Sequence, residues 1–558
     1  MNKIYIFIIV ASFIAINAFG QQTRTTFYKE KMPHYTATYI NDTILDGPYV
    51  EYYFSGKKRQ EGTYTNGNMS GLWIQFYANG DTLSNINYTD GPFVIWFENR
   101  QVQVKGQVVD GEKSGAWKEY YPNGILKNTE FYKNGKLDSV CNYYRADESI
   151  IDIRRYNAGI MQGEWMSYYP NGNIRIKGNY NNNLKQGDWK EWYLTGEILA
   201  VVPSEKGKYI SYYRNGAIKS QGQFANRIRE GKWEMFHLNG KLSEFYSYNN
   251  GLRYGNTAKY YQNGEKEFEG IFDNDSLNGA AKWWYENGNI EMEGFLKDDL
   301  QDSTWIFYYQ SGQKGSAGNF VKGDMDGQWD YWYAKGGELW KRGNYKLGIK
   351  DGLWSTWFEN EQKLQEGNYT NGSESGLWHS WYDNGQPLAL GSFNGGLMDG
   401  KWESWFKDGT KNYIYNYKNN IKDGTALQYY SNGKKKYEGA YKMGKLDGKY
   451  TQWYNTGNLL EKGKYKQGDK VGKWEFYDNR GRLYKKQSFV DGKPSGKWVE
   501  YYVRGNKKAE GEYKGILKHG VWSYWDKKGN LVLKQKYNNG KKEEILFDVK
   551  SGGGFPKR

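Results

Sequence analysis

Cysteine, histidine and proline are scarce in this chain of 558 residues, which has one Cys, four His and nine Pro. A single cysteine cannot form an internal disulfide, so the chain is not a disulfide-stapled scaffold. So few Cys and His residues also argue against a structural metal protein. Long apolar runs are absent after the first twenty residues, which excludes a bundle of transmembrane helices.

Aromatic residues and glycine are abundant instead. The chain has 53 Tyr, 24 Trp and 24 Phe, together 18% of its residues, and 71 Gly. Disordered chains are poor in aromatic residues, so this composition favours a folded protein.

Residues 1–20 have the features of a secretory signal peptide, here predicted to be cleaved before Gln21. Lys3 provides a positive start, an apolar stretch follows, and Ala18 and Gly20 are the small residues expected before a cleavage site. The alternative is an N-terminal membrane anchor, but the apolar stretch is short for a span of about 20 residues. We therefore expect export, with a periplasmic, outer-membrane-associated or cell-surface location.

A unit of the form G-x-W-x-x-Y-Y-x-N-G recurs 21 times between Gly47 and Gly529. Seventeen of the twenty steps between units are 24 residues, two are 20 and one is 25. The third position is Trp in thirteen units, and we expect these residues to form the structural core of the repeats: Trp73, Trp117, Trp165, Trp189, Trp233, Trp305, Trp329, Trp354, Trp378, Trp402, Trp474, Trp498 and Trp522.

Each unit predicts one β-hairpin. The aromatic segment suits a strand, and Asn-Gly after it predicts a tight type I′ turn. A second strand carries G-x-Y, and a looser glycine-rich turn leads to the next unit. Strand alternation puts the Trp and the second Tyr of W-x-x-Y-Y on one face and the first Tyr on the other. We expect Trp to stack on Trp from unit to unit in an all-β, single-layer antiparallel sheet.

The sequence therefore predicts four segments. Residues 1–20 are the signal peptide, 21–46 an N-terminal cap with a strand at Tyr35–Tyr39, 47–545 the tandem repeats, and 546–558 a flexible basic tail.

Residues 437–450, Y-E-G-A-Y-K-M-G-K-L-D-G-K-Y, resemble the MORN repeat, Y-x-G-x-W-x-x-G-x-x-x-G-x-G. Tyr441 occupies the Trp position and Tyr450 replaces the last Gly, as in the variant repeats of bacterial YwqK-family antitoxins. The resemblance covers about residues 44–545. It implies an elongated sheet of about 21 successive hairpins, scaffold, dimerisation or lipid-proximal roles, and no shared catalytic residues. An antitoxin role fits poorly with a signal peptide. Choline-binding cell-wall repeats are similar in composition, but they place W-Y-Y contiguously.

Charge is distributed unevenly along the chain. Residues 421–558 contain 32 Lys and Arg against 15 Asp and Glu, whereas residues 251–400 contain 13 against 22. Two interpretations remain for the basic end: solvated lysines that discourage strand addition, or a docking site for an anionic partner such as lipid, lipopolysaccharide or an acidic protein. Nucleic acid is not an expected partner outside the cytoplasm. The candidate docking residues are Lys434, Lys435, Lys436, Lys507, Lys508, Lys527, Lys528, Lys541 and Lys542.

No catalytic, cofactor-binding or metal site is expected. The four histidines lie in four different contexts, and Cys141 occupies a Trp position, where a buried structural thiol is expected. We therefore predict a non-enzymatic exported scaffold that mediates protein–protein interaction in a bacterial envelope or cell-surface complex, including the outer membrane. The alternative is a surface module that binds glycans or anionic lipids through aromatic rows and the basic end.

Overall fold

A computed structural model describes residues 15–16, 20–29 and 31–551. The chain divides into two units, Met1–Ser276 and Leu277–Arg558. The described residues are β-strands and turns, apart from one 3-10 turn, η1 (Val549–Ser551). None of the described segments is a helix with the length and apolarity that crossing a membrane requires.

The strands of unit 1 are β1 (Ala15–Ile16), β2 (Gln21–Lys29), β3 (Met32–Ile40), β4 (Ile44–Tyr52), β5 (Lys58–Thr65), β6 (Asn68–Phe76), β7 (Thr82–Asn87), β8 (Gly91–Trp96), β9 (Val102–Val109), β10 (Glu112–Tyr120), β11 (Leu126–Lys133), β12 (Lys136–Leu137), β13 (Ser139–Tyr144), β14 (Ile150–Asn157), β15 (Ile160–Met161), β16 (Gly163–Tyr168), β17 (Ile174–Asn181), β18 (Leu184–Trp192), β19 (Ile198–Pro203), β20 (Gly207–Tyr212), β21 (Ile218–Ala225), β22 (Ile228–Phe236), β23 (Leu242–Asn249), β24 (Leu252–Arg253), β25 (Gly255–Tyr260) and β26 (Lys266–Asp273).

After β27 (Ser276–Leu277) the strands of unit 2 are β28 (Gly279–Trp284), β29 (Ile290–Lys297), β30 (Leu300–Tyr308), β31 (Lys314–Val321), β32 (Asp324–Trp332), β33 (Leu339–Lys346), β34 (Ile349–Lys350), β35 (Gly352–Trp357), β36 (Lys363–Thr370), β37 (Ser373–Trp381), β38 (Pro387–Asn394), β39 (Leu397–Trp405), β40 (Lys411–Lys418), β41 (Ile421–Tyr429), β42 (Lys435–Lys442), β43 (Lys445–Leu446), β44 (Gly448–Trp453), β45 (Leu459–Lys466), β46 (Asp469–Tyr477), β47 (Leu483–Val490), β48 (Lys493–Tyr501), β49 (Lys507–Lys514), β50 (Leu517–Trp525), β51 (Leu531–Asn538) and β52 (Lys541–Asp548).

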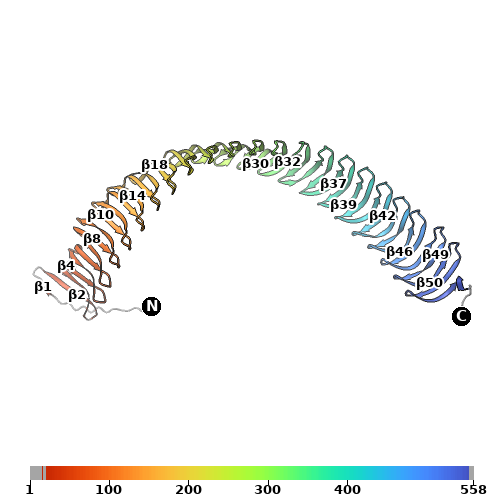
Figure 1. The fold of residues 1–558 in the computed structure, drawn as a ribbon, viewed down its shortest axis with the longest axis horizontal. Helices are drawn as coiled ribbons and strands as arrows, with labels where there is room; N and C mark the ends of the chain where they lie inside the picture. Colours follow the sequence, from red (N-terminus) through yellow and green to blue (C-terminus); the bar gives the residue numbers. More distant parts are fainter. Residues whose placement is uncertain (1–14, 17–19, 30, 552–558) are drawn as a thin grey trace. The chain divides into compact units, whose positions relative to one another are not determined.

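Within each unit the strands pair antiparallel with their neighbours in the sequence, so each unit is one layer of successive hairpins (Figure 1). In unit 2, for example, β36 pairs with β37, and β37 with β38. The pairing confirms the predicted all-β sheet of tandem hairpin repeats. Core residues are therefore supplied by one face of the sheet, which we call the core face; the other is the open face.

The two turns of each repeat differ from the prediction, because the type I′ turn lies at the opposite edge of the sheet. At the Asn-Gly turn after the aromatic segment, Gly80 has φ +97° and its N–H donates to the Tyr77 carbonyl at 2.8 Å, whereas Asn79 does not have a positive φ. This is a type I turn followed by a left-handed glycine. Asn79 keeps a right-handed backbone because its Oδ1 accepts the Asp81 N–H at 2.8 Å. The predicted type I′ geometry is wrong here, and we call this side the Asn-Gly edge.

Two consecutive residues with positive φ occur instead at the opposite edge, where a looser turn was predicted. Asn66 and Gly67 have φ +50° and +82°, and Asn371 and Gly372 have φ +48° and +81°. These values fit type I′ turns, which match the twist of the strands they join. Both ends of a repeat are thus tight, which fixes the register of every hairpin.

Both ends of the described chain contain strands. The predicted cap forms β2 and β3, and β3 includes Tyr35–Tyr39 and pairs with β4. At the other end, residues 546–548 of the predicted flexible tail belong to β52, because Phe547 and Asp548 pair with β51, and residues 549–551 form η1. Residues 1–14 and 17–19 of the predicted signal peptide and residues 552–558 of the tail lie outside the described residues.

Eleven of the thirteen predicted core tryptophans are buried, and each lies over a glycine of the preceding strand. A Cβ atom on Gly343 would lie 2.0 Å from Cδ2 of Trp354, so glycine is required wherever the indole crosses that strand. Trp165 and Trp498 are only half-buried. Arg154 and Gln487 stand eleven residues before them, where the other eleven have glycine.

Trp-on-Trp stacking is not the rule along the core face. Tyr or Phe rings alternate with the indoles, as along Trp354, Tyr369, Trp378, Phe393 and Trp402, where successive centroids are 5.0–6.0 Å apart and the rings meet edge to face. Edge-to-face contacts suit the quadrupoles of aromatic rings. Consecutive core-position indoles contact each other beside the two sites without glycine, at Trp165–Trp189 and Trp498–Trp522.

Candidate interaction surfaces

The open face carries one aromatic residue in every repeat, three positions after the core position. We call this set the aromatic row. It comprises Tyr52, Phe76, Trp96, Tyr120, Tyr144, Tyr168, Trp192, Tyr212, Phe236, Tyr260, Trp284, Tyr308, Trp332, Trp357, Trp381, Trp405, Tyr429, Trp453, Tyr477, Tyr501 and Trp525. All 21 are half-buried, whereas the core tryptophans are almost all buried.

Neighbouring side chains on the open face pack against residues of the aromatic row. His379 and Trp381, two residues apart on β37, have ring centroids 4.0 Å apart. Burial lowers the pKa of His379. Lys363 Nζ lies 5.9 Å from the Trp381 ring, and Lys435 Nζ lies 5.7 Å from the Trp453 ring. The stems of such lysines cover part of an aromatic ring while the ammonium stays in water. Trp381 and Trp453 thus each present a partly covered ring to solvent.

Ion pairs flank the row in some of the repeats. A Lys just after the Asn-Gly edge pairs with a Glu three residues later in five repeats: Lys58–Glu61, Lys266–Glu269, Lys363–Glu366, Lys435–Glu438 and Lys507–Glu510. The bond with Glu438 raises the pKa of Lys435. Exposed pairs of this kind add little stability, but they make the open face mixed in charge between its aromatic rings.

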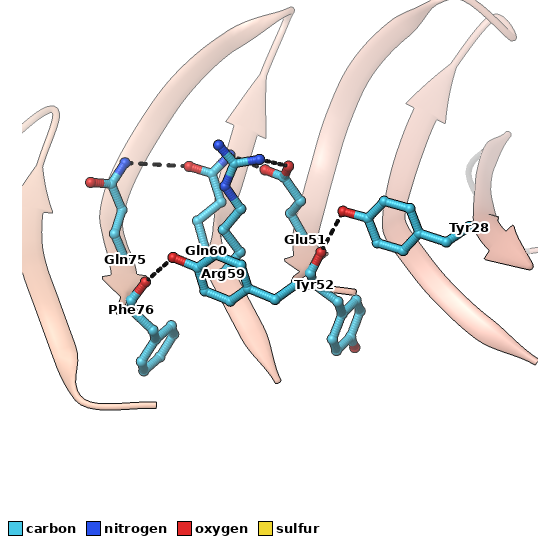
Figure 2. Close-up of polar contacts among 8 residues, drawn as sticks. Tyr28, Glu51, Tyr52, Arg59, Gln60, Gln75 and Phe76 are labelled. Carbon is cyan, nitrogen blue, oxygen red and sulfur yellow. Dashed lines mark hydrogen bonds and ion pairs between the residues drawn. The ribbon is translucent and has the colours of Figure 1, made fainter. Parts of the chain in front are cut away.

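The backbone of the row is tied to the preceding repeat by a hydroxyl. Tyr28 donates to the Tyr52 carbonyl at 3.0 Å and Tyr53 to the Phe76 carbonyl at 2.7 Å (Figure 2). The same bond recurs elsewhere in both units, for example from Tyr382 to the Trp405 carbonyl and from Tyr430 to the Trp453 carbonyl. In one repeat Arg145 replaces the Tyr and donates to the Tyr168 carbonyl. We call these bonds tyrosine clasps.

A polar ladder runs across three hairpins of unit 1. Gln60 donates to Glu51 at 2.7 Å and accepts from Gln75 at 3.3 Å (Figure 2), and Ser84 donates to Gln75 at 3.0 Å. Glu51 also pairs with Arg59 at 2.8 Å. Because each polar group has a partner, the ladder is explained by the packing of the core face.

The candidate docking lysines do not form one patch. Lys435, Lys507 and Lys508 pair with Glu438, Glu510 and Glu500. The ammonium of Lys434 donates to the Thr456 carbonyl, and that of Lys436 lies 5.8 Å from the Tyr430 ring.

Four other lysines remain exposed, and none of them forms an ion pair with another described residue. Lys527 and Lys528 lie at the Asn-Gly edge, whereas Lys541 and Lys542 begin β52 at the opposite edge. Anion docking would therefore involve separated sites.

Residues with acid–base or nucleophilic chemistry are dispersed. His34 lies 4.3 Å from the Tyr28 ring, His237 Nε2 bonds the Tyr260 carbonyl in a clasp position, and His519 lies in β50. Cys141 is fully buried, and burial raises the pKa of its thiol. Among the described residues, no three His, Cys, Asp or Glu side chains are placed to hold a metal ion.

Sequence reasoning placed the first Tyr of W-x-x-Y-Y on the other face but did not recognise a row. The available signal was simple: that position is aromatic in all 21 repeats, whereas the core position is aromatic in 17. A position kept aromatic more strictly than the core indicates a surface with a role of its own.

Comparison with known families identifies the repeat. The model described as MORN repeat variant matches ten segments, residues 45–66, 113–134, 161–182, 205–226, 229–250, 277–298, 350–371, 398–419, 422–443 and 446–467. The chain carries MORN repeat variants. Tandem repeats of this type indicate a scaffold for protein or membrane interaction. None of the curated proteins matches the chain.

Several solved structures match the repeats at low similarity. The crystal structures of TcdB2-TccC3-Cdc42 and of TcdB2-TccC3-TEV are 9% and 10% identical to the chain and cover 93% and 94% of it, with a TM-score of 0.13 for both. The chain spans about a third of the length of these proteins, 34% and 32% respectively.

Proposed function

We propose that the protein is an exported, non-enzymatic scaffold that holds partner proteins of a bacterial envelope or cell-surface complex against its open face. The aromatic row is the observation that carries this proposal. It offers one half-exposed ring per hairpin, at steps of two strands or about 10 Å. Interfaces are enriched in Tyr, Trp and Phe, which supply large contact areas at low entropic cost.

Rigidity supports the same role. Both turns of each repeat are tight, and tyrosine clasps link many repeats to the next, so the spacing of the rings is set before a partner arrives. Preorganised contacts lose less entropy on binding than mobile ones. Export is proposed from the first twenty residues, whose charge and apolar stretch fit a signal peptide.

The test replaces three neighbouring row residues, Trp357, Trp381 and Trp405, by Ser. Partner proteins are identified first, by photo-crosslinking from Tyr429 in intact cells. We expect the triple variant to recover at least about tenfold less of the crosslinked partner. The matched control is Leu377→Ser, a 60% exposed open-face residue outside the row. Equal crosslinking by the triple variant, or no partner from intact cells, would contradict the proposal.

The half-exposed tryptophans also favour a second candidate function, binding of glycans or anionic lipids. Nine of the 21 row residues are Trp, and flat indoles stack well on sugar rings. Sedimentation with insoluble cell-wall polysaccharide, and flotation with vesicles of phosphatidylglycerol, separate the two ligands. If the protein stays in solution in both assays, the protein scaffold is the better account.

A further inference from the structure

Each repeat has a second position on the core face, opposite its first residue, that is nearly always a ring. Tyr369 faces Gly352 and Phe393 faces Gly376. Tyr or Phe occupies this ring position in eighteen repeats, and Val108 and Leu296 occupy two more. The ring separates the indole of its own repeat from the next, as Tyr369 does between Trp354 and Trp378.

Ser204 is the one polar residue at the ring position. It belongs to one of the two 20-residue repeats. Its N–H donates to the Gly187 carbonyl at 2.9 Å, so Ser204 lies opposite the first residue of its repeat, as Tyr369 and Phe393 do in theirs. Trp189 therefore has Tyr180 on one side, at 5.1 Å, and no ring from its own repeat on the other. The strand beyond Trp189 offers Val202 and Pro203 instead.

A cavity of about 560 Å³ occupies this place. Its lining includes Tyr180, Trp189, Val202, Pro203 and Phe224, which form an aromatic and aliphatic part of the wall, and polar or charged side chains form the rest. The volume falls in the range of ordinary ligand pockets, roughly 300–1,000 Å³. The missing ring of the short repeat explains why the cavity exists.

The indole of Trp189 also lacks the hydrogen bond that other core indoles make. Ten of them, Trp354 among them, donate from Nε1 to the carbonyl ten residues earlier, here that of Asn344 at 3.0 Å. Trp189 is 3% exposed, and its Nε1 has no partner among the described residues. A buried donor without an acceptor costs about 1–3 kcal/mol.

Charged side chains stand around the cavity. Lys185 Nζ lies 4.2 Å from the Trp189 ring, and Arg227 Nε donates to the Ser204 carbonyl at 3.1 Å. Glu191 also lines the cavity. Neither Lys185, Arg227 nor Glu191 forms an ion pair with another described residue. With two cations against one carboxylate, the rim is positive overall and suits an anionic ligand group.

We infer that this cavity binds a Tyr or Phe side chain followed by an acidic residue, presented by an extended segment of a partner protein. The ring takes the edge-to-face place beside Trp189 that Tyr or Phe fills in eighteen repeats, and the carboxylate pairs with Lys185 and Arg227. This inference rests on the proposed function, because the ligand is part of a partner protein, but it concerns the opposite face from the aromatic row.

The other 20-residue repeat provides a natural comparison. There Tyr88 occupies the ring position, its N–H donates to the Gly71 carbonyl at 2.9 Å, and its ring lies 6.5 Å from that of Trp73. Trp73 is 1% exposed and donates to the Thr63 carbonyl at 3.0 Å. A short repeat is therefore compatible with a filled ring position, and the serine at 204 is a separate feature.

The experiment uses the purified full chain and a probe tetrapeptide, acetyl-Gly-(4-fluoro-Phe)-Glu-Gly-amide, observed by the linewidth of its fluorine signal. We expect the unaltered protein to broaden the signal at least about twofold. Ser204→Tyr should abolish the broadening and raise the melting temperature, since the new ring fills the cavity. Thr195→Tyr, at the exposed Asn-Gly edge of the same repeat, should leave the broadening intact.

Charge is tested separately. Arg227→Asn, which suits the positive φ of +63° at this position, and replacement of the probe Glu by Lys should each weaken binding about threefold or more. The inference is overturned if the unaltered protein leaves the linewidth unchanged, or if broadening survives Ser204→Tyr. It is also overturned if neither charge change alters it.

Failure here is distinguishable from failure of the proposed function. Row variants that lose the partner while the probe does not bind would reject the cavity alone. Probe binding without any crosslinked partner would reject the scaffold proposal alone.

Discussion

Two places in unit 2 fill the same core space in opposite ways. In the Gly–Trp arrangement, Gly367 lies under Trp378, and a Cβ atom on that glycine would lie 2.1 Å from the indole Cδ2. Two repeats later, Tyr415 stands at the glycine position and pairs directly with Ala426 at the tryptophan position. Tyr415 is 7% exposed and Ala426 1% exposed, so the exchanged pair is as well buried as the ordinary one.

The comparison shows that the total volume of the pair is maintained while its two members change places. Unit 1 contains a similar exchange, in which Tyr246 precedes Thr257 by eleven residues and Thr257 is 2% exposed. A close-packed core tolerates substitutions that keep volume better than those that change it. The large residue can therefore come from either strand, provided that the other strand supplies a small one.

The largest loss of folding stability is expected from Gly367→Ala. The added methyl would overlap the Trp378 ring, which is held by a 3.1 Å bond from Nε1 to the Asn368 carbonyl. Overpacking of this kind costs about 1–3 kcal/mol, and we expect the upper end. Hydrogen exchange of β36 and β37 measures the local loss.

Ala426→Gly is the matched control, and the expected cost is only about 1 kcal/mol because no clash is created. Equal losses at the two sites would show that glycine under Trp378 is not required sterically.

The second prediction converts one arrangement into the other. Tyr415→Gly should leave a cavity and Ala426→Trp should clash with Tyr415, so each single variant is expected to lose about 2–3 kcal/mol. The double variant recreates a Gly–Trp pair and should recover at least about 1 kcal/mol of the summed loss. A double-mutant cycle on hydrogen-exchange free energies measures this coupling. Strict additivity would mean that the two residues do not share one space.

Much of this fold could be predicted because the same sequence pattern occurs in every repeat. The 24-residue period, the hairpins and the core position of Trp73 and its equivalents all follow from spacing and strand alternation. The turn types could not be predicted in the same way. Asn-Gly favours type I′ in isolation, but here the Asn79 side chain accepts the Asp81 N–H and selects a type I turn with a left-handed glycine.

The candidate sites were less accessible to sequence reasoning. The aromatic row was hidden because half-burial cannot be distinguished from full burial in an aromatic-rich strand. The cavity depends on an absence, the ring that Ser204 lacks, and becomes visible only when Gly187 is aligned with the other repeats. Likewise, the pairing of Lys435 with Glu438 and of Lys507 with Glu510 depends on side-chain contacts that charge counts do not contain.

The third prediction compares two neighbouring repeats, one with a tyrosine clasp and one without. Tyr382 donates to the Trp405 carbonyl at 3.0 Å, whereas Phe406 holds the equivalent position one repeat later and has no hydroxyl. Tyr382→Phe should cost about 1 kcal/mol, and Phe406→Tyr should gain up to about the same by bonding the Tyr429 carbonyl. Thermal unfolding of the two variants checks both signs. A loss of stability in Phe406→Tyr would show that the repeat beside the exchanged pair has a different edge geometry.

The smallest change in stability is expected at Glu475, which follows core residue Trp474. In the repeat with the exchanged pair Tyr415 and Ala426, Leu427 stands at the equivalent position. Burial alone would raise the pKa of Glu475, but hydrogen bonds from Lys486, Tyr477 and Lys462 outweigh it and lower the pKa from 4.5 to about 2. Because the folded-state pKa is depressed, the stabilisation is complete above about pH 4.5 and is lost as the pH falls toward 2.

We therefore expect Glu475→Gln to reduce stability at pH 7 and to flatten its decline between pH 4.5 and 2. Leu427→Gln, a matched change without a carboxylate to titrate, should shift stability equally at all pH values. Denaturant unfolding across this range distinguishes the two variants. Parallel curves for Glu475→Gln and the unaltered protein would contradict the prediction, because the ion pairs with Lys462 and Lys486 would then not stabilise the Glu475 carboxylate in the folded state.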